Sequence, residues 1–372
     1  MRYRVLITGG AGFIGSHLVD ELLRQGHQTR ILDNLSPQVH GPNASRPGYL
    51  DARAELLVGD VREASDVRRA LEGIDAVVHL AAAVGVGQSM YEIAEYTSVN
   101  NLGTAVLLEQ LARQPVRRLV VASSMSIYGE GRYADAAGNH YDRAERTLAD
   151  LRSGHWEPRA ASSTDLIPVA TPEEKVPALS SVYALSKYDQ ERLCLMIGRA
   201  YGIPAVALRF FNTYGPRQAL SNPYTGVLAI FASRLLNGKA PLLFEDGKQR
   251  RDFVSVHDVA RACTLALESE AAVGSAINVG SGHSINIAEV AQRLAETLDR
   301  TSIRAEVTGQ HRVGDIRHCF ADITKARELL GYSPRVSLTE GMAELGQWLR
   351  SERAEDRFDA ARRELETRGL TL

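Results

Sequence analysis

The chain begins with a strand, a glycine-rich turn and a helix: Arg4-Val5-Leu6-Ile7-Thr8-Gly9-Gly10-Ala11-Gly12-Phe13-Ile14-Gly15-Ser16-His17-Leu18. The apolar, β-branched run at residues 5–7 predicts a strand that is buried on both faces. Gly9 permits a backbone angle that side chains disfavour, Gly12 lets a phosphate approach the main chain, and Gly15 lets the helix lie close to the sheet. The N-terminus of the helix presents free N–H groups and a positive dipole end. This GxxGxxG turn directly after a strand predicts a dinucleotide site rather than an ordinary βα turn.

An acidic residue, Asp33, ends the next apolar run at residues 29–32. A carboxylate at this place can bind both hydroxyls of an adenosine ribose and would repel a 2′-phosphate. Asp33 therefore favours NAD over NADP. The alternative is that it only caps the turn at Asp33-Asn34, which precedes a loop.

Composition excludes several classes of protein. The chain has 372 residues, of which 44% are hydrophobic and 24% charged, with a net charge of −2. These values are typical of a soluble protein with more than one lobe, and they give no indication of nucleic acid or of an anionic membrane as a partner. Because a strand begins almost at Met1, we expect no signal peptide, and no apolar run is long enough to span a membrane. The three distant cysteines suit a reducing cytoplasm, and the histidines show no metal-binding spacing.

Strands alternate with helices in the first third of the chain. Further strands are predicted at residues 29–32, 55–58, 75–80 and 118–122, with a long helix over Tyr91–Arg113. This alternation predicts an α/β fold with a doubly wound parallel sheet, which is Rossmann-like, and right-handed crossovers. Ligands bind at the carboxyl ends of such strands. At these ends stand Gly9, Asp33, Asp60, Ala81 and Ser123-Ser124.

Two changes of pattern divide the chain. Residues 129–178 are polar and rich in Pro, Gly and Ser, and a connection of this length is either functional or mobile. Regularity returns with a helix at Val182–Tyr201, and the remainder mixes short strands and helices without a second glycine motif. We predict an NAD-binding domain over residues 1–208, with an atypical insert at 129–178. Residues 209–372 are predicted to form mainly a smaller α/β substrate lobe, with some segments returning to the first domain.

A phenol and an ammonium lie one helical turn apart at Tyr183 and Lys187. A phenol with a pKa near its reference value of about 10 is a poor base at neutral pH, and lowering that pKa by about three units takes roughly 4 kcal/mol. A nearby ammonium and an oxidised nicotinamide could supply this stabilisation in a dry pocket. The pattern is common on ordinary helices, but here the helix follows a strand that ends in Ser123-Ser124-Met125-Ser126. A hydroxyl can therefore share the site with the phenol.

Together these residues resemble the extended short-chain dehydrogenase/reductase superfamily, in its nucleotide-sugar epimerase/dehydratase branch. The resemblance covers nearly the whole chain. Besides the glycine motif and the Tyr/Lys pair it rests on Gly59-Asp60-Val61, His79-Leu80-Ala81-Ala82, Asn100, Ser123–Gly129, Arg209–Arg217, Arg251–Val254 and Gly314-Asp315. It implies a tightly bound NAD, a UDP- or dTDP-sugar substrate, and a homodimer formed through the helices at 91–113 and 182–201.

The resemblance also implies roles for single residues. The catalytic positions are matched by Ser124, Tyr183 and Lys187, and Lys187 also matches a ligand of the nicotinamide ribose. The NAD contacts, with Asp60 and Val61 at the adenine, fall on Gly9, Gly12, Phe13, Ile14, Gly15, Asp33, Asn34, Asp60, Val61, Leu80, Ala81, Ala82, Asn100, Tyr183 and Lys187. The substrate contacts fall on Ser126, Asn212, Arg217, Arg251, Arg312 and Cys319. Guanidinium groups suit a diphosphate because they bind its oxygens in pairs.

Several of these positions also have a plainer interpretation. Arg251 and Arg312 fit ordinary surface ion pairs, and Asn212 fits a turn. Cys319 matches a place where a small side chain leaves room for a bulky substituent on C2 of the sugar, but it fits a small core cysteine equally well. The insert at 129–178 is longer than the usual connection of the family. It is either a lid or specificity element beside the substrate, or surface decoration.

Met125 and Ser126 bear on the type of reaction. Related 4,6-dehydratases carry an Asp-Glu pair at these positions and decarboxylases keep the Glu, whereas Met and Ser cannot act as acid and base at neutral pH. We therefore expect an isomerase, a nucleoside-diphosphate-sugar 4-epimerase. Tyr183 would take the proton of the sugar 4-hydroxyl while Ser124 bridges the two oxygens, and the 4-keto sugar would turn and be reduced on its other face. The alternatives are a reductase or dehydrogenase of a nucleotide sugar, a decarboxylase or dehydratase, and a non-catalytic NAD-sensing module.

Overall fold

A sheet of seven parallel strands forms the centre of the computed structural model, which describes residues 2–42, 45–224, 226–312, 314–352 and 354–371. The strand order is β14-β9-β5-β4-β1-β2-β3, and every neighbouring pair is parallel. The strands are β1 (Arg4–Thr8), β2 (Gln28–Asp33), β3 (Glu55–Val58), β4 (Ala76–His79), β5 (Arg118–Ser124), β9 (Ala205–Phe210) and β14 (Ala276–Val279). The predicted doubly wound α/β fold is confirmed.

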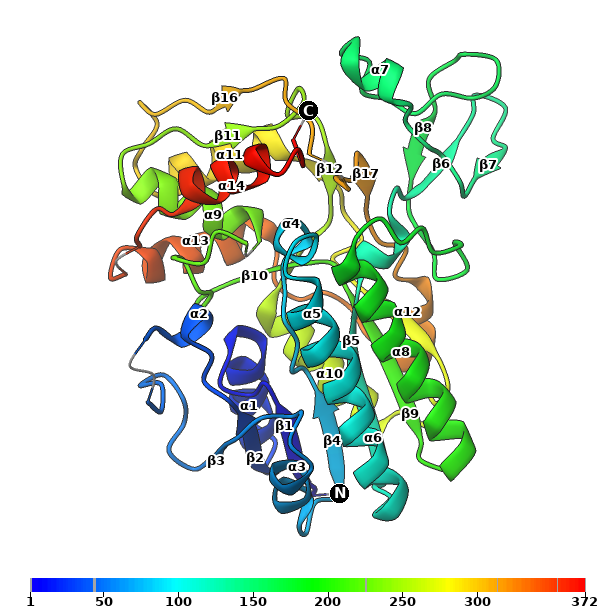
Figure 1. Cartoon of the computed structure of the whole chain (residues 1–372), viewed down its shortest axis with the longest axis vertical. Helices are drawn as coiled ribbons and strands as arrows, with labels where there is room; N and C mark the ends of the chain where they lie inside the picture. Colours follow the sequence, from blue (N-terminus) through cyan, green and yellow to red (C-terminus); the bar gives the residue numbers. More distant parts are fainter. Residues whose placement is uncertain (1, 43–44, 225, 313, 353, 372) are drawn as a thin grey trace.

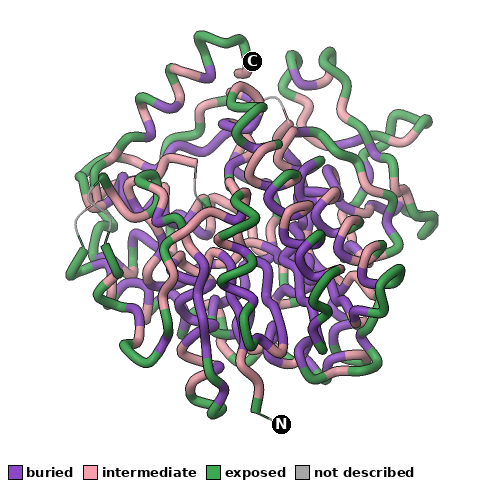
Figure 2. The backbone as a smooth tube through the Cα atoms, turned by 60° about the horizontal axis from the view of Figure 1, so that its bottom comes forward, coloured by how far each residue is buried: buried purple, intermediate pink, exposed green. Residues whose placement is uncertain are grey.

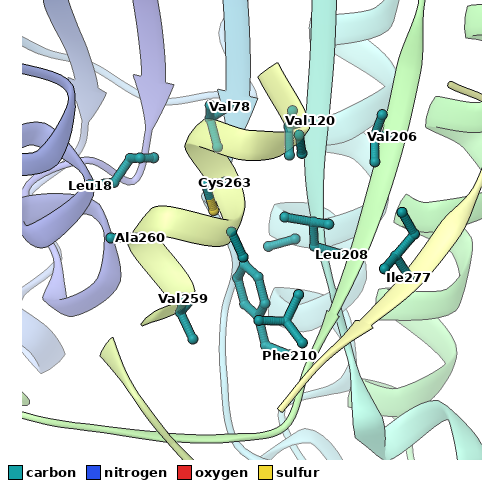
Figure 3. Packing of buried hydrophobic residues seen from close by; sticks show 14 of the residues in the cluster. Leu18, Val78, Val120, Val206, Leu208, Phe210, Val259, Ala260, Cys263 and Ile277 are labelled. Atoms are coloured by element: carbon teal, nitrogen blue, oxygen red, sulfur yellow. The ribbon is translucent and has the colours of Figure 1, made fainter. Parts of the chain in front are cut away.

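Helices cover both faces of this sheet (Figure 1). The covering helices are α1 (Phe13–Arg24) and α10 (Val256–Glu268) on one face, and α3 (Ala64–Leu71), α6 (Gly103–Arg113) and α8 (Val182–Tyr201) on the other. Leu18 and Cys263 belong to one cluster of buried side chains with Val78 and Val120 (Figure 3). The strands other than β3 are therefore mostly buried, whereas β3 at the edge of the sheet is partly exposed and the outer faces of the helices are exposed (Figure 2). A strand covered on both faces has no polar side to alternate with, which explains the continuous apolar runs in the sequence.

A smaller C-terminal lobe has its own apolar core. Its helices are α9 (Val227–Leu236), α11 (Ile287–Thr297) and α13 (Leu338–Leu349). Its short strands pair as β10 (Asn212–Tyr214) with β13 (Phe253–Ser255), as β11 (Leu242–Leu243) with β16 (Glu306–Val307), and as β15 (Ile285–Asn286), β12 (Arg250–Arg251) and β17 (His318–Cys319). Not all of the second half belongs to this lobe, because β14 is a strand of the large sheet, and α10 and α12 (Thr324–Leu330) pack on that sheet.

The insert at 129–178 contains more regular structure than its composition predicts. It forms a three-stranded antiparallel sheet in the order β7 (His140–Tyr141), β6 (Arg132–Ala134) and β8 (Ile167–Val169). The short helix α7 (Leu148–Arg152) lies between β7 and β8 in the sequence. Strands of two or three residues are too short for a period-two pattern to be visible in the sequence. A small apolar cluster of its own includes Tyr133 and Leu166.

The helix expected over Tyr91–Arg113 is divided into α5 (Ile93–Tyr96), a π-helical segment (Thr97–Leu102) and α6. Such segments are rare and are frequent at functional sites. The C-terminal segment contains α13 and, after it, α14 (Phe358–Thr367). Within the described ranges, no helix has both the length and the apolar character that crossing a membrane requires.

Candidate active site

The glycine turn after β1 leaves room at one position and is tightly packed at two others. A Cβ on Gly9, where φ is +69°, would lie 2.9 Å from the Ala81 nitrogen, and a Cβ on Gly15 would lie 2.5 Å from the Cα of Gly10. A Cβ on Gly12 would meet only the Gly9 carbonyl oxygen, at 3.5 Å. The fold thus requires glycine at 9 and 15, whereas at 12 it leaves space for a ligand. Since α1 begins directly after Gly12 without a side-chain cap, its first N–H groups can bind a phosphate.

Asp33 lies directly against this turn. Its Oδ2 accepts a hydrogen bond from the Ala11 nitrogen at 3.0 Å, and its Oδ1 accepts one from the Leu35 nitrogen at 2.9 Å. These bonds are those of a turn cap, but each carboxylate oxygen has a second lone pair that a ribose hydroxyl can use. Next to it, Asn34 donates to the Asp60 carboxylate at 3.1 Å. Both interpretations of Asp33 are therefore compatible with its position.

The other predicted NAD residues lie along the same edge of the sheet. Arg62, which donates to Asp60, lowers the pKa of that carboxyl to about 2, so Asp60 is ionised at neutral pH. Val61 is buried and packs beside Gly103. After β4, the Leu80 nitrogen donates to the Thr8 carbonyl at 3.1 Å. The carboxyl ends of β1, β2, β3 and β4 and the segments that follow them thus carry the predicted residues from Gly9 to Ala82, whereas Asn100, Tyr183 and Lys187 come from the π-helical segment and α8.

Asn100 owes its position to the π-helical segment. Its Oδ1 accepts from the Ala83 nitrogen at 2.7 Å, and its Nδ2 donates to the Ala83 carbonyl at 3.1 Å and to the Ser186 hydroxyl at 2.8 Å. Asn100 is fully buried and so fixes the segment after β4 against α8. Its side chain thus holds the main chain at Ala83 in place.

Ser124 and Tyr183 lie together at the end of β5. Ser181 caps α8 by accepting from the Ala184 nitrogen, which places Tyr183 in the first turn of that helix. Ser124 lies close enough to Tyr183 that its hydroxyl lowers the pKa of the phenol. The Ser124 oxygen also accepts from the Ser126 hydroxyl at 2.9 Å. The structure thus brings the predicted phenol and hydroxyl together.

Lys187 is buried one turn after Tyr183 and donates to the Gln190 side chain at 2.7 Å. Burial lowers the pKa of Lys187 to about 8. Burial also raises the pKa of Tyr183, and the nearby Ser124 hydroxyl only partly offsets this rise. The sequence predicts that Lys187 depresses the Tyr183 pKa, but the protein's own groups leave it above its ordinary value.

Gln190, the polar residue that holds Lys187, is not among the residues predicted from the sequence. The Gln190 amide donates to the Thr104 hydroxyl at 2.8 Å, and His79 lies between Thr104 at 2.9 Å and Thr8 at 2.7 Å. Burial lowers the pKa of His79 to about 3, so its imidazole is neutral. The spacing of Gln190, three residues after Lys187 on the same helix, is the signal that could have identified it.

A cavity of about 280 Å³ lies between the large sheet and the C-terminal lobe. Its lining includes Ser126, Asn212, Arg251 and Arg312, which are four of the six predicted substrate residues. The Oδ1 of Asn212 is buried and has no hydrogen-bond partner among the described residues. An unpaired buried oxygen of this kind is expected where a ligand completes the site. We call this space the inter-lobe cavity.

The two arginines of the inter-lobe cavity are fixed differently. Arg251 donates to the Ile316 and Arg317 carbonyls, the latter at 3.0 Å. Arg312 pairs with Asp315 at 2.9 Å, and its guanidinium lies 4.3 Å from the centre of the Phe244 ring. The ion pair of Arg312 is real, but it forms part of the cavity lining. Both guanidinium groups line the inter-lobe cavity.

Two predicted substrate residues do not join the inter-lobe cavity. Arg217 pairs with Asp20 of α1 at 2.7 Å and lies over the ring of Tyr49 at 5.5 Å, beside a separate groove of about 1590 Å³. The positive φ of 67° at Arg217 accompanies this turn of the chain towards α1. Cys319 is 1% exposed, its sulfur is 3.9 Å from the Thr171 hydroxyl, and burial raises the pKa of its thiol to about 12. The structure thus places it as the small core cysteine.

A buried group of ion pairs lies directly behind the cavity lining. Arg317, which is 1% exposed, pairs with Glu157 at 2.6 Å, with Glu245 at 2.9 Å and with Asp246 at 2.6 Å. Burial alone would raise the pKa of Glu245, but His311 and the neighbouring arginines hold it at about 2.

The insert takes part in this group through three of its residues. Arg146 pairs with Glu130 at 3.0 Å and with Glu245 at 2.5 Å, and it also donates to the Asp315 carbonyl at 2.9 Å. Glu157, the third insert residue, pairs with Arg317. The insert is therefore joined by hydrogen bonds and ion pairs to the segment that carries Arg312, Asp315 and Arg317.

The fold and the Ser/Tyr/Lys group define a Rossmann-type enzyme that uses a dinucleotide. The chain belongs to the NAD dependent epimerase/dehydratase family, whose model matches residues 5–148 and 160–280. NAD is its cofactor, and the open position at Gly12, the uncapped start of α1 and Asp33 fit that molecule.

Known relatives cover almost the whole chain. The dTDP-L-rhamnose 4-epimerase of Burkholderia thailandensis is 34% identical, over 94% of this chain and 95% of its own length. The UDP-N-acetyl-alpha-D-glucosaminuronate decarboxylase of Bacillus cytotoxicus is 32% identical, over 94% and 98%. The crystal structure of the UDP-glucuronic acid 4-epimerase of Bacillus cereus, in complex with UDP-glucuronic acid and NAD, superposes with a TM-score of 0.75 at 27% identity, over 93% of this chain and 99% of the other. The chain is thus similar to enzymes of nucleotide sugars that catalyse more than one reaction.

Proposed function

We propose that the protein is an NAD-dependent nucleoside-diphosphate-sugar 4-epimerase that acts on a UDP- or dTDP-sugar. One observation carries this proposal. Ser126 lines the inter-lobe cavity, its hydroxyl donates to Ser124, and Ser124 lies close enough to Tyr183 to lower the pKa of the phenol. A chain of hydroxyls thus connects the cavity with the phenol, so a sugar hydroxyl bound there can exchange a proton with Tyr183.

The residues of this chain can then be given roles. Tyr183 removes the proton of the sugar 4-hydroxyl and later returns it. Ser124 donates a hydrogen bond to the Tyr183 oxygen when that oxygen is a phenolate. Because burial raises the pKa of Tyr183, the phenolate needs a positive charge from outside the described side chains. NAD, when bound, supplies that charge and the hydride acceptor. Lys187, held by Gln190, binds the nicotinamide ribose.

Substrate binding is assigned to the four residues that line the cavity. Arg251 and Arg312 would hold the diphosphate, and the unpaired Oδ1 of Asn212 would accept a hydrogen bond from the ligand. Arg217 and Cys319 are less suited to this role, because one pairs with Asp20 and the other is buried in the core.

The side chains after Ser124 favour epimerisation over elimination or decarboxylation. Met125 and Ser126 line the cavity, and neither can serve as an acid or a base at neutral pH. Among the described residues of the cavity, the one carboxylate is that of Asp315, and it is paired with Arg312. The similarity to a decarboxylase keeps that reaction as the second candidate.

We also infer a homodimer through α6, α8 and the π-helical segment. Apolar side chains are exposed there, with Leu102 at 53%, Leu185 at 46% and Met196 at 57% exposure. Apolar side chains gathered on neighbouring helices mark an association surface. Sedimentation analysis should give twice the mass of the chain, and a Met196→Asp substitution should shift it to the monomer.

The test of the function is incubation of the NAD-loaded enzyme with a panel of UDP- and dTDP-sugars. We expect one pair of C4 isomers to interconvert from either side without net change in NADH absorbance. Stoichiometric formation or consumption of NADH would identify a dehydrogenase or a reductase instead. Release of carbon dioxide from a UDP-uronic acid would identify a decarboxylase.

A further inference from the structure

The C-terminal helix α14 lies along one side of the inter-lobe cavity. Figure 1 shows α14 alongside α9, with the C-terminus beyond it. The residues of α14 that line the cavity are Phe358, Ala361, Arg362 and Leu365. Their spacing of three and four places them on one face of the helix. One face of α14 is therefore directed at the proposed substrate, and not at solvent.

The first turn of α14 is attached to the C-terminal lobe. Asp359 pairs with Arg234 of α9 at 2.8 Å and with Lys239 at 3.1 Å. Phe358 is buried in a cluster with Leu242 and Phe244, the residue on which Arg312 lies. The N-terminal end of α14 is therefore held to the C-terminal lobe by ion pairs and by apolar packing.

The last turn of α14 reaches the other side of the cavity. The Leu365 methyl groups lie close to α4 (Val86–Ser89), since a Cβ on Gly87 would be 3.4 Å from them. The Arg368 guanidinium lies 4.5 Å from the centre of the Tyr91 ring. After the helix, Thr371 forms a backbone bridge with Arg312. The helix and the residues after it thus connect the two lobes across the cavity.

Arg362 is the charged residue on the cavity face of α14. It donates to Glu366, one turn later, at 2.8 Å, and the two side chains are 31% and 37% exposed. An exposed pair of this kind contributes little, so the guanidinium can exchange Glu366 for a phosphate at small cost. By contrast, Arg251 is already engaged by carbonyls and Arg312 by Asp315.

We propose that Arg362 is a substrate-binding residue and that α14 forms one side of the nucleotide-sugar site. This inference rests on the proposed function, because it assumes a ligand with a diphosphate in the inter-lobe cavity. The family model ends at residue 280, so the family pattern does not assign a role to this helix. The ligand class that the site selects is a nucleoside diphosphate, free or attached to a sugar.

The experiment compares Arg362→Gln with Arg363→Gln in the full-length, NAD-loaded enzyme. Arg363 is the neighbouring residue of the same helix and is exposed, so its substitution removes the same charge away from the cavity. Calorimetric titration with UDP and with dTDP measures binding without turnover. We expect about tenfold weaker binding for Arg362→Gln and less than about twofold for Arg363→Gln, because a charge-assisted contact is lost only in the first.

Further readouts separate the possible failures. The KM of Arg362→Gln should rise by a similar factor while kcat stays within about twofold, and the melting temperatures of both variants should match that of the unmodified enzyme. Equal nucleotide affinity of the two variants would overturn the role of Arg362 and leave the proposed function intact. Absence of binding of both UDP and dTDP to the unmodified enzyme would instead overturn the proposed function. Glu366→Gln, which removes the competing carboxylate, should bind UDP at least as tightly as the unmodified enzyme.

Discussion

The proposed NAD edge and the proposed substrate edge of the protein are built from different kinds of chemical groups. The proposed NAD edge is built mainly from a glycine turn and the main chain around it, and its closest contacts are those of Gly9 and Gly15. The proposed substrate edge carries long charged side chains and adjoins a buried group of ion pairs around Arg317. The structure of the NAD edge depends on close packing around glycine, and the structure of the substrate edge depends on complete pairing of buried charges. The two should therefore fail in different ways when they are altered.

The largest effect on stability is expected at the substrate edge. Arg317→Leu leaves Glu245, Asp246 and Glu157 without their shared cation, which should cost about 3–5 kcal/mol of unfolding free energy. Chemical denaturation measures this loss. The control is Arg293→Gln on α11, whose pair with Glu289 at 2.5 Å is exposed, and it should cost less than about 1 kcal/mol. Equal losses of unfolding free energy in the two variants would show that the buried ion pairs of Arg317 stabilise the fold no more than an exposed pair does.

At the NAD edge, two glycine substitutions should separate packing from ligand binding. Gly15→Ala places a Cβ 2.5 Å from the Gly10 Cα. It should lower the unfolding free energy by about 1–3 kcal/mol and should also lower the NAD content. Gly12→Ala meets only the Gly9 oxygen at 3.5 Å, so its stability should be unchanged while its NAD content falls. Melting temperature and cofactor content of the purified variants measure the two quantities. If Gly12→Ala retained full NAD, the phosphates would not approach the chain at that point.

A smaller effect is expected from pH. The folded-state pKa values of Glu245 and Glu157 are lowered from 4.5 to about 2, so their stabilisation is present above pH 4.5 and is lost as the pH falls towards 2. The unfolding free energy of the unmodified enzyme should therefore decrease more steeply between pH 4.5 and 2 than that of Arg317→Leu. Parallel curves would mean that Arg317 does not hold these carboxylates ionised.

The same contrast explains how much could be predicted from sequence. The alternation of strands and helices, the glycine turn and Asp33 are local patterns that predict the α/β fold and NAD, and both predictions are confirmed. For the π-helical segment at Asn100 the sequence predicts an ordinary α-helix, because the pattern of apolar residues is the same in both kinds of helix.

The substrate edge could be predicted only in part. Arg251, Arg312 and Asn212 stand in recognisable motifs, and the structure brings them together. The pair between Arg146 and Glu245 joins residues far apart in the chain, and no local pattern indicates it. Arg217 belongs to a matching motif, yet the chain turns there and directs the side chain to Asp20 of α1.

The central claim is that Tyr183 exchanges the proton of a sugar hydroxyl in a reaction without net redox change. The most direct test is the rate of C4 interconversion of a UDP- or dTDP-sugar by Tyr183→Phe, which removes a single oxygen atom. We predict a decrease in kcat of about 10²–10⁴-fold, with NAD content and nucleotide affinity unchanged. Full turnover by Tyr183→Phe would contradict the account.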